Sequence, residues 1–153
     1  MFKFTDTKAL SDAGAWVHIK DGPRPAYWPD KKGEPDLDKP VRIKVMGPDS
    51  PAFQKKARRR TAERIKRMGG SFDMGKMSQM EIEAFLDENQ DVDSENWTDA
   101  TIAWENIPDE NGKPLEFNEI NAEWLYETYP AIVRQLKDEA GDIDDFLALA
   151  GAS

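Results

Sequence analysis

The chain has 153 residues, 39% of them hydrophobic, and its five Trp and seven Phe predict one domain with a small, aromatic-rich core. It has no cysteine, no apolar run long enough to span a membrane and no N-terminal apolar core typical of a signal peptide, which excludes disulfides, thiolate metal sites and a membrane-spanning role. The net charge of −9 is unevenly divided, because residues 1–80 hold 18 Lys/Arg against 10 Asp/Glu and residues 81–153 hold 3 against 20.

Two alternating segments near the N-terminus predict β-strands. Residues 16–20 alternate apolar and polar side chains, and residues 40–46 place β-branched side chains on one face and two cations on the other. The connection between them is rich in Pro, Gly and charge, and residues 26–28 fit a short edge strand within it. We predict that residues 15–46 form a small antiparallel hairpin or three-strand meander. It needs a helix on its apolar face, since a hairpin alone is marginal in water.

A strongly basic helix is predicted for residues 50–68. Ser50 is the expected N-cap and Pro51 the first-turn proline, and Gly69-Gly70 stops the helix. Within residues 55–67 there are eight Lys/Arg and one acid. The candidate basic surface consists of Lys55, Lys56, Arg58, Arg59, Arg60 and Arg64.

This basic surface has two interpretations. It fits phosphate groups of a nucleic acid, or it docks on the acidic half of the chain or on an acidic partner. No aromatic residue interleaves with the cations, and the rest of the chain is acidic enough to repel DNA. We therefore expect nucleic acid to be the less favoured partner.

The tryptophan-rich stretch after residue 96 predicts the end of a helix and a tight turn. Trp97, Thr101 and Trp104 recur at helical spacing, so we predict that they share a helix that ends before Pro108. Asn111-Gly112 predicts the turn because both residues tolerate positive φ. The apolar residues after the turn are expected to pack back on the two indoles.

A longer helical region follows, with an N-cap at Asn118. Its predicted apolar stripe includes Tyr129, whereas Tyr126 falls off the stripe and Trp124 borders it. Pro130 either kinks this helix or starts a new one. Aromatic residues beside a stripe are typical anchors of interfaces, and a groove for a partner helix is one interpretation. The candidate partner-binding residues are Trp97, Trp104, Trp124, Tyr126 and Tyr129.

No catalytic, cofactor-binding or metal-binding residue is predicted. His18 is the only histidine, and without a motif around it we expect a structural role. A calcium-binding EF-hand loop starting at Asp87 would place Val92 where glycine is needed and Thr98 where a glutamate is needed. The acidic stretch is therefore interpreted as solvated surface.

The predicted fold class is α+β, mainly helical, with a small N-terminal antiparallel hairpin or meander. Residues 1–153 form a single predicted domain. Its parts are a β element at 15–46, the basic helix at 50–68, an acidic helical part at 78–140 that opens with a capping box at Ser78, and a short C-terminal helix or tail at 141–153.

Three segments resemble the tail assembly chaperones of long-tailed (siphovirus-type) bacteriophages and prophages. They are residues 41–53 (VRIKVMGPDSPAF), residues 104–107 (WENI) and residues 109–115 (DENGKPL) with the following Phe117. The order of elements is also similar, with a β element, a basic helix and an acidic helical half. The resemblance covers the chain from about Trp16 to about Leu136.

The resemblance implies an assembly factor that is not an enzyme and has no cofactor. It implies transient binding of the tape-measure protein and tail-tube subunits in the host bacterial cytoplasm, with self-association left open, and absence from the mature virion. The alternative is a small phage or prophage regulator that binds nucleic acid through residues 55–67.

Overall fold

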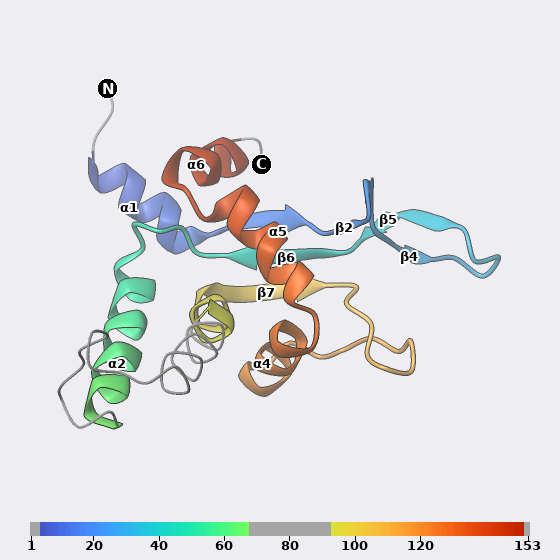
Figure 1. Ribbon diagram of the computed structural model, residues 1–153. Coiled ribbons are helices and arrows are strands. Elements are labelled where there is room, and N and C mark those ends of the chain that lie inside the picture. Colours follow the sequence, from blue (N-terminus) through green and yellow to red (C-terminus); the bar gives the residue numbers. More distant parts are fainter. Residues whose placement is uncertain (1–3, 68–92, 152–153) are drawn as a thin grey trace.

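The computed structural model describes residues 4–67 and 93–151 and has a mixed α+β fold that is mainly helical, which confirms the predicted fold class (Figure 1). The elements in chain order are α1 (Phe4–Ala13), β1 (Ala15–His18), β2 (Lys20–Asp21), β3 (Arg24–Pro25), β4 (Tyr27–Pro29), β5 (Pro35–Pro40), β6 (Arg42–Val45), α2 (Pro51–Arg67), a helical segment at 93–100, β7 (Thr101–Glu105), α4 (Glu119–Thr128), α5 (Pro130–Ala140) and α6 (Ile143–Gly151). The predicted helix beginning at Ser78 and residues 87–92 of the rejected calcium loop lie outside the described residues.

The central sheet is antiparallel, with the strand order β1-β6-β7. β1 pairs with β6, as the hairpin prediction requires, and the connection between them folds into two further ladders, β2–β3 and β4–β5. Alternation sends Ile43 and Val45 inward, where both are fully buried. Arg42 lies on the opposite face, with its guanidinium 4.3 Å from the ring centroid of Trp16.

β7 contradicts the predicted helix from Trp97 to Trp104. Helical geometry ends at residue 100, and Trp104 then pairs with Ile43 across the β6–β7 ladder. The segment Thr101–Glu105 contains β-branched and aromatic residues, which suit a half-buried strand. It also fills the edge of β6 that the β1–β6 hairpin leaves open. Pairing with a distant strand therefore outweighs the helical spacing.

Trp104 nevertheless packs on the residues after the turn, as predicted. Its ring meets Phe117 edge-on with centroids 5.0 Å apart, and its Nε1 donates a hydrogen bond to the backbone oxygen of Leu115 at 2.9 Å. The predicted turn is confirmed by a φ of 77° at Gly112, and its N–H donates to the backbone oxygen of Asp109 at 3.1 Å.

The predicted helix starts are confirmed by their caps. Ser50 Oγ accepts a hydrogen bond from the backbone N–H of Phe53 at 3.1 Å at the start of α2. Asn118 Oδ1 accepts from the backbone N–H of Asn121 at 2.7 Å at the start of α4. Of the two alternatives at Pro130, the structure shows the second, because this proline starts α5.

α1 is an element that the sequence reasoning missed. Its signal is Gly14, which has a φ of 84° and donates its N–H to the backbone oxygen of Leu10 at 3.1 Å, as helix-terminating glycines do. α1 packs against α2 and α6 near Gly47. A Cβ at Gly47 would lie 2.6 Å from Ser11 Oγ and 2.7 Å from the ring of Phe146, so only glycine fits there without repacking.

α5 and α6 supply the helical cover that the β element requires, and both contact β1 (Figure 1). The core between these helices and the sheet contains the fully buried side chains of Val17, Leu136 and Phe146. Phe146 is the buried residue of α6 and joins this helix to the core.

We expect Trp104→Ala to lower the free energy of unfolding by about 3–5 kcal/mol, because it removes a large buried ring and leaves a cavity. The indole is only 8% exposed. Urea denaturation followed by circular dichroism measures the loss. The control is Leu37→Ala, since Leu37 is 74% exposed and should change stability by less than about 0.5 kcal/mol. A similar small change for Trp104→Ala would contradict the core assignment.

Candidate partner-binding surface

The five aromatic residues predicted to bind a partner do not share one surface. Trp104 and Tyr126 are buried in the core, Trp97 and Trp124 are half-buried, and Tyr129 is 47% exposed. Trp124 and Tyr129 meet edge-on with ring centroids 6.0 Å apart. A partner can therefore reach Trp124, Tyr129 and the open part of Trp97, whereas the other two rings hold the fold together.

Two predictions about the apolar stripe are wrong. Tyr126 was expected off the stripe but lies on it, and Tyr129 was expected on the stripe but lies off it. The stripe of α4 follows Ala122, Leu125 and Tyr126 at helical spacing. It does not continue through Tyr129 because Pro130 starts a new helix with a different direction.

The Tyr126 hydroxyl has a structural role. It lies 2.5 Å from Thr101 Oγ1, whose single hydrogen is donated to the backbone oxygen of Trp97 at 2.6 Å, so Tyr126 is the donor to Thr101. Burial raises the pKa of the Tyr126 hydroxyl above its ordinary value. This group therefore stays protonated and joins α4 to the start of β7.

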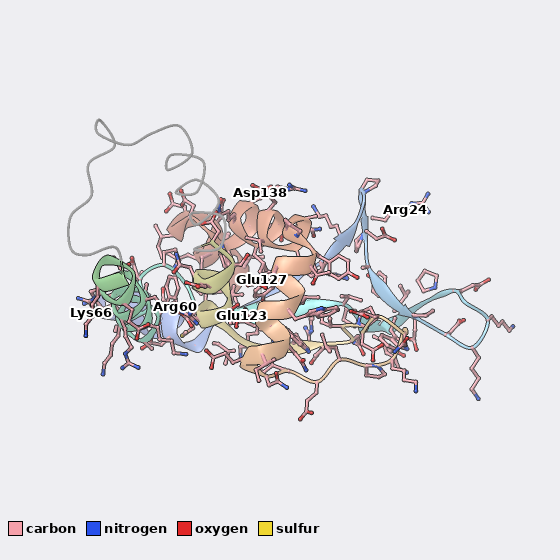
Figure 2. The ribbon with its side chains drawn as sticks, turned by 60° about the horizontal axis from the view of Figure 1, so that its bottom comes forward. Arg24, Arg60, Lys66, Glu123, Glu127 and Asp138 are labelled. Atoms are coloured by element: carbon pink, nitrogen blue, oxygen red, sulfur yellow. The ribbon has the colours of Figure 1, made fainter. Side chains whose placement is uncertain are left out.

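The candidate basic surface lies on α2, which extends away from the sheet (Figures 1 and 2). Lys55, Lys56, Arg58 and Arg59 are exposed, and the side chain of Arg64 is outside the described part of the structure. Arg60 differs from these residues because it is half-buried and points toward the acidic half of the chain.

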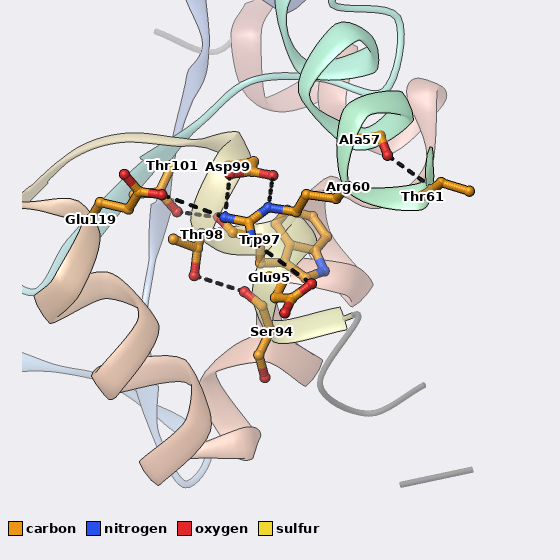
Figure 3. A network of polar contacts seen from close by, with 10 residues as sticks. All are labelled: Ala57, Arg60, Thr61, Ser94, Glu95, Trp97, Thr98, Asp99, Thr101 and Glu119. Carbon is orange, nitrogen blue, oxygen red and sulfur yellow. Dashed lines mark hydrogen bonds and ion pairs between the residues drawn. The ribbon is translucent and has the colours of Figure 1, made fainter. Parts of the chain in front are cut away.

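Arg60 joins α2 to the acidic half through a network of carboxylates (Figure 3). Its Nε and Nη2 donate to Asp99 Oδ2 and Oδ1 at 2.5 and 2.9 Å. Its guanidinium nitrogens also lie 3.7 Å from Glu95 and 3.5 Å from Glu119. The side chain of Asp99 is only 8% exposed, so this two-bond pair is largely shielded from water. The hydrogen bond to Asp99 raises the pKa of Arg60, which keeps the guanidinium charged.

A groove of about 750 Å³ lies beside this pair, between α2 and the start of β7. Lys56, Arg59 and Arg60 line it from α2, while Asp99 and Glu119 line it from the other side. The two walls carry opposite charges, so a ligand with both signs of charge fits the groove better than a simple anion or cation.

Within residues 4–67 and 93–151, no serine, histidine and aspartate are arranged together as a nucleophilic site requires. Ser50 Oγ donates to Asp12 Oδ1 at 2.5 Å at the foot of α2, whereas His18 Nε2 lies 2.8 Å from the backbone oxygen of Ala26. His18 also meets Tyr27 edge-on. The histidine is therefore engaged by the β4 region and does not contact the serine.

The outer side of α4 carries an exposed residue that the sequence reasoning missed. Ile120 is 79% exposed and lies one turn before Trp124. Its position opposite the buried residues of α4 was the available signal. Glu123 and Glu127 lie one turn apart on the same helix (Figure 2), and each is three residues after one of the apolar residues Ile120 and Trp124. We call Ile120, Glu123, Trp124, Glu127 and Tyr129 the α4 surface.

Comparison of the chain with protein-family models, with curated proteins and with solved structures gave no match. Among residues 4–67 and 93–151, no group of His, Cys, Asp and Glu side chains is arranged to hold a metal ion. No helix in the same ranges combines the length and the apolar composition needed to cross a bilayer.

We expect Arg60→Ala to lower the free energy of unfolding by about 1–3 kcal/mol, because it leaves the Asp99 carboxylate buried without its cation. Arg59→Ala is the matched control, since Arg59 is the exposed neighbour on the same helix, and its effect should be below about 0.5 kcal/mol. Thermal and urea unfolding at low and high NaCl measure both variants. Salt should reduce the effect of Arg60→Ala only partly, because Asp99 is shielded. Equal effects of the two variants would contradict an internal role for Arg60.

Proposed function

We propose that this chain is a tail assembly chaperone of long-tailed bacteriophages or prophages, which binds the tape-measure protein and tail-tube subunits transiently. The main support for the proposal is the position, in the fold, of the segments that resemble this family. The resembling residues at 41–53 and those at 104–107, 109–115 and 117 lie far apart in the chain, yet the pairing of β6 with β7 places Ile43 opposite Trp104. Two separate resemblances that fold into one packed unit support a common origin better than either does alone.

The surface of the molecule also suits a protein that binds other polypeptides. Large apolar side chains at Ile120 and Tyr129 face solvent beside an acidic helix, where they can accept an apolar stripe of a partner helix. Among the described residues, Glu123 and Glu127 have no ion-pair partner. Their charge keeps the free molecule soluble and opposes self-association through this face.

The proposal assigns no catalytic residue, cofactor or metal. At the groove beside α2, Arg60 is already paired with Asp99 and Glu119. By contrast, Lys56 and Arg59 on its wall form no ion pair among the described residues. A general acid or base works best with a pKa near the operating pH, and the raised pKa of Arg60 moves that group further from this range. The groove therefore supports binding better than proton transfer.

Co-expression tests the proposal. We expect the tagged protein to recover a co-expressed phage tape-measure protein, and to increase the soluble fraction of that protein, because it covers exposed apolar stripes. The measurement is a pull-down from nuclease-treated lysate. Co-expression with an unrelated coiled-coil protein of similar length is the control. If neither the tape-measure protein nor a tail-tube subunit is recovered, the proposal is wrong.

The exposed cations of α2 support one alternative, a regulator that binds nucleic acid. Lys55, Lys56, Arg58 and Arg59 are free of ion pairs among the described residues and face solvent. Phosphate binding through four cations gives an affinity that falls steeply with salt, with a slope of roughly −3 to −4 on logarithmic axes.

A mobility-shift titration with duplex DNA at several salt concentrations separates the two functions. We expect no shift for the chaperone, because the acidic half opposes the approach of DNA. A salt-dependent shift that disappears when Lys55, Lys56, Arg58 and Arg59 are changed to Gln would instead favour the regulator.

A further inference from the structure

The outer side of α4 carries large apolar side chains among its glutamates. Ala122, Leu125 and Tyr126 face the core, so the opposite side of α4 faces solvent. That side carries Ile120, 79% exposed, and the half-buried Trp124 one turn later, with Tyr129 at the end of the helix. Ile120 and Trp124 are neighbours because they are four residues apart on the helix, and Trp124 meets the ring of Tyr129 edge-on, so the three side chains form an apolar ridge. Contiguous apolar surface of this kind marks an interaction site.

Glutamate is the charged residue on α4 beside this ridge. Residues 114–133 contain four Glu and no Lys or Arg. Arg134 and Lys137, the cations of α5 that line the same hollow as Glu127, form no ion pair with it. Glu123 and Glu127 are spaced four residues apart, so they repel each other along the helix. In the described part of the chain, neither forms an ion pair with a cation. This repulsion lowers the stability of the free protein, and a cationic partner would relieve the repulsion.

We propose that the α4 surface binds an amphipathic helix of another protein, whose apolar stripe is flanked by Lys or Arg. This inference specifies the contact surface of the chaperone proposed above. It rests on that function in one respect, namely that the partner is a helical polypeptide. Side chains four residues apart on α4 form a row that can pack into the groove between two rows of side chains on a second helix. The glutamates select a basic partner, because an acidic one would meet uncompensated like charge.

The basic helix α2 of a second copy fits this surface less well. The exposed side of α2 carries Lys55, Lys56, Arg58 and Arg59 in close succession, without an apolar stripe between them. It would satisfy the glutamates and leave Ile120 and Trp124 uncovered. A separate protein that supplies both charge and an apolar stripe covers the whole surface.

The test uses the full-length protein and three synthetic helical peptides of equal length. The first has Leu at helical spacing flanked by Lys, the second replaces Lys with Glu, and the third keeps Lys and replaces Leu with Ser. Isothermal titration calorimetry measures binding. We expect the first peptide to bind at least about tenfold more tightly than either of the others, because only it matches both the ridge and the charge.

Two variants place the binding on α4. Ile120→Ser removes the most exposed apolar side chain, and the double variant Glu123→Gln and Glu127→Gln removes the charge without changing side-chain size. Each should weaken binding of the first peptide by at least about fivefold, and the double variant should also reduce its salt dependence. Ile120 and Glu127 are exposed and Glu123 is half-buried, and circular dichroism verifies that the variants fold.

Matched controls exclude non-specific attraction of a cationic peptide to an acidic protein. Leu37→Ser alters an equally exposed apolar residue on β5, and the double variant Glu34→Gln and Glu110→Gln removes the same charge from exposed positions outside α4. The controls should change binding by less than about twofold. If they weaken binding as much as the α4 variants do, or if the α4 variants change self-association alone, the inference is wrong.

The two proposals fail separately. If the tape-measure protein is recovered equally well by wild type and by Ile120→Ser, and the peptides do not discriminate, the chaperone function stands and the α4 surface is not its contact. If the peptides discriminate and the α4 variants lose binding while no tail protein is recovered, the surface is confirmed and the tail-assembly role is wrong.

Discussion

The pairing of β6 on both of its edges is the constraint on which the rest of the structure depends. β1 and β6 alone would form a two-stranded hairpin, which is marginal in water. β7 completes a sheet large enough to bury Ile43 and Val45 beneath α5 and α6. Because Trp104 on β7 also bonds to Leu115, the same pairing positions the turn and the start of α4. The α4 surface is therefore placed by a contact that lies in the core.

Local signals predicted much of this fold, and the misses have a common physical cause. The caps at Ser50 and Asn118 and the turn at Gly112 depend on bonds within a few residues, so the sequence alone reveals them. β7 depends on an open strand edge far away in the chain, which spacing within a segment cannot show. Tyr126 was misplaced because the stripe was extended through Pro130, where the helix direction changes.

The same distinction applies to the candidate site. The six cations of the basic surface are alike in sequence, and Arg60 becomes distinct only because Asp99 is held opposite it by the helical segment at 93–100. The exposure of Ile120 likewise follows from which side of α4 meets the core. Composition shows that the halves differ in charge. The structure shows that ion pairs of Arg60 with Asp99, Arg42 with Glu105 and Lys20 with Glu139 connect them. The exposed cations of α2 and two glutamates of α4, Glu123 and Glu127, form no ion pair among the described residues.

The distance between β6 and β7 in the chain has a consequence for synthesis on the ribosome. About 55 residues lie between Val45 and Thr101, and at roughly 5–20 residues per second their translation takes about 3–11 s. During that interval the nascent β6 has an uncovered edge, to which strands of other nascent chains can add. α2 emerges directly after β6, and its dense positive charge makes neighbouring nascent chains repel one another. This repulsion opposes the addition of strands from neighbouring nascent chains to β6 until β7 has been synthesised.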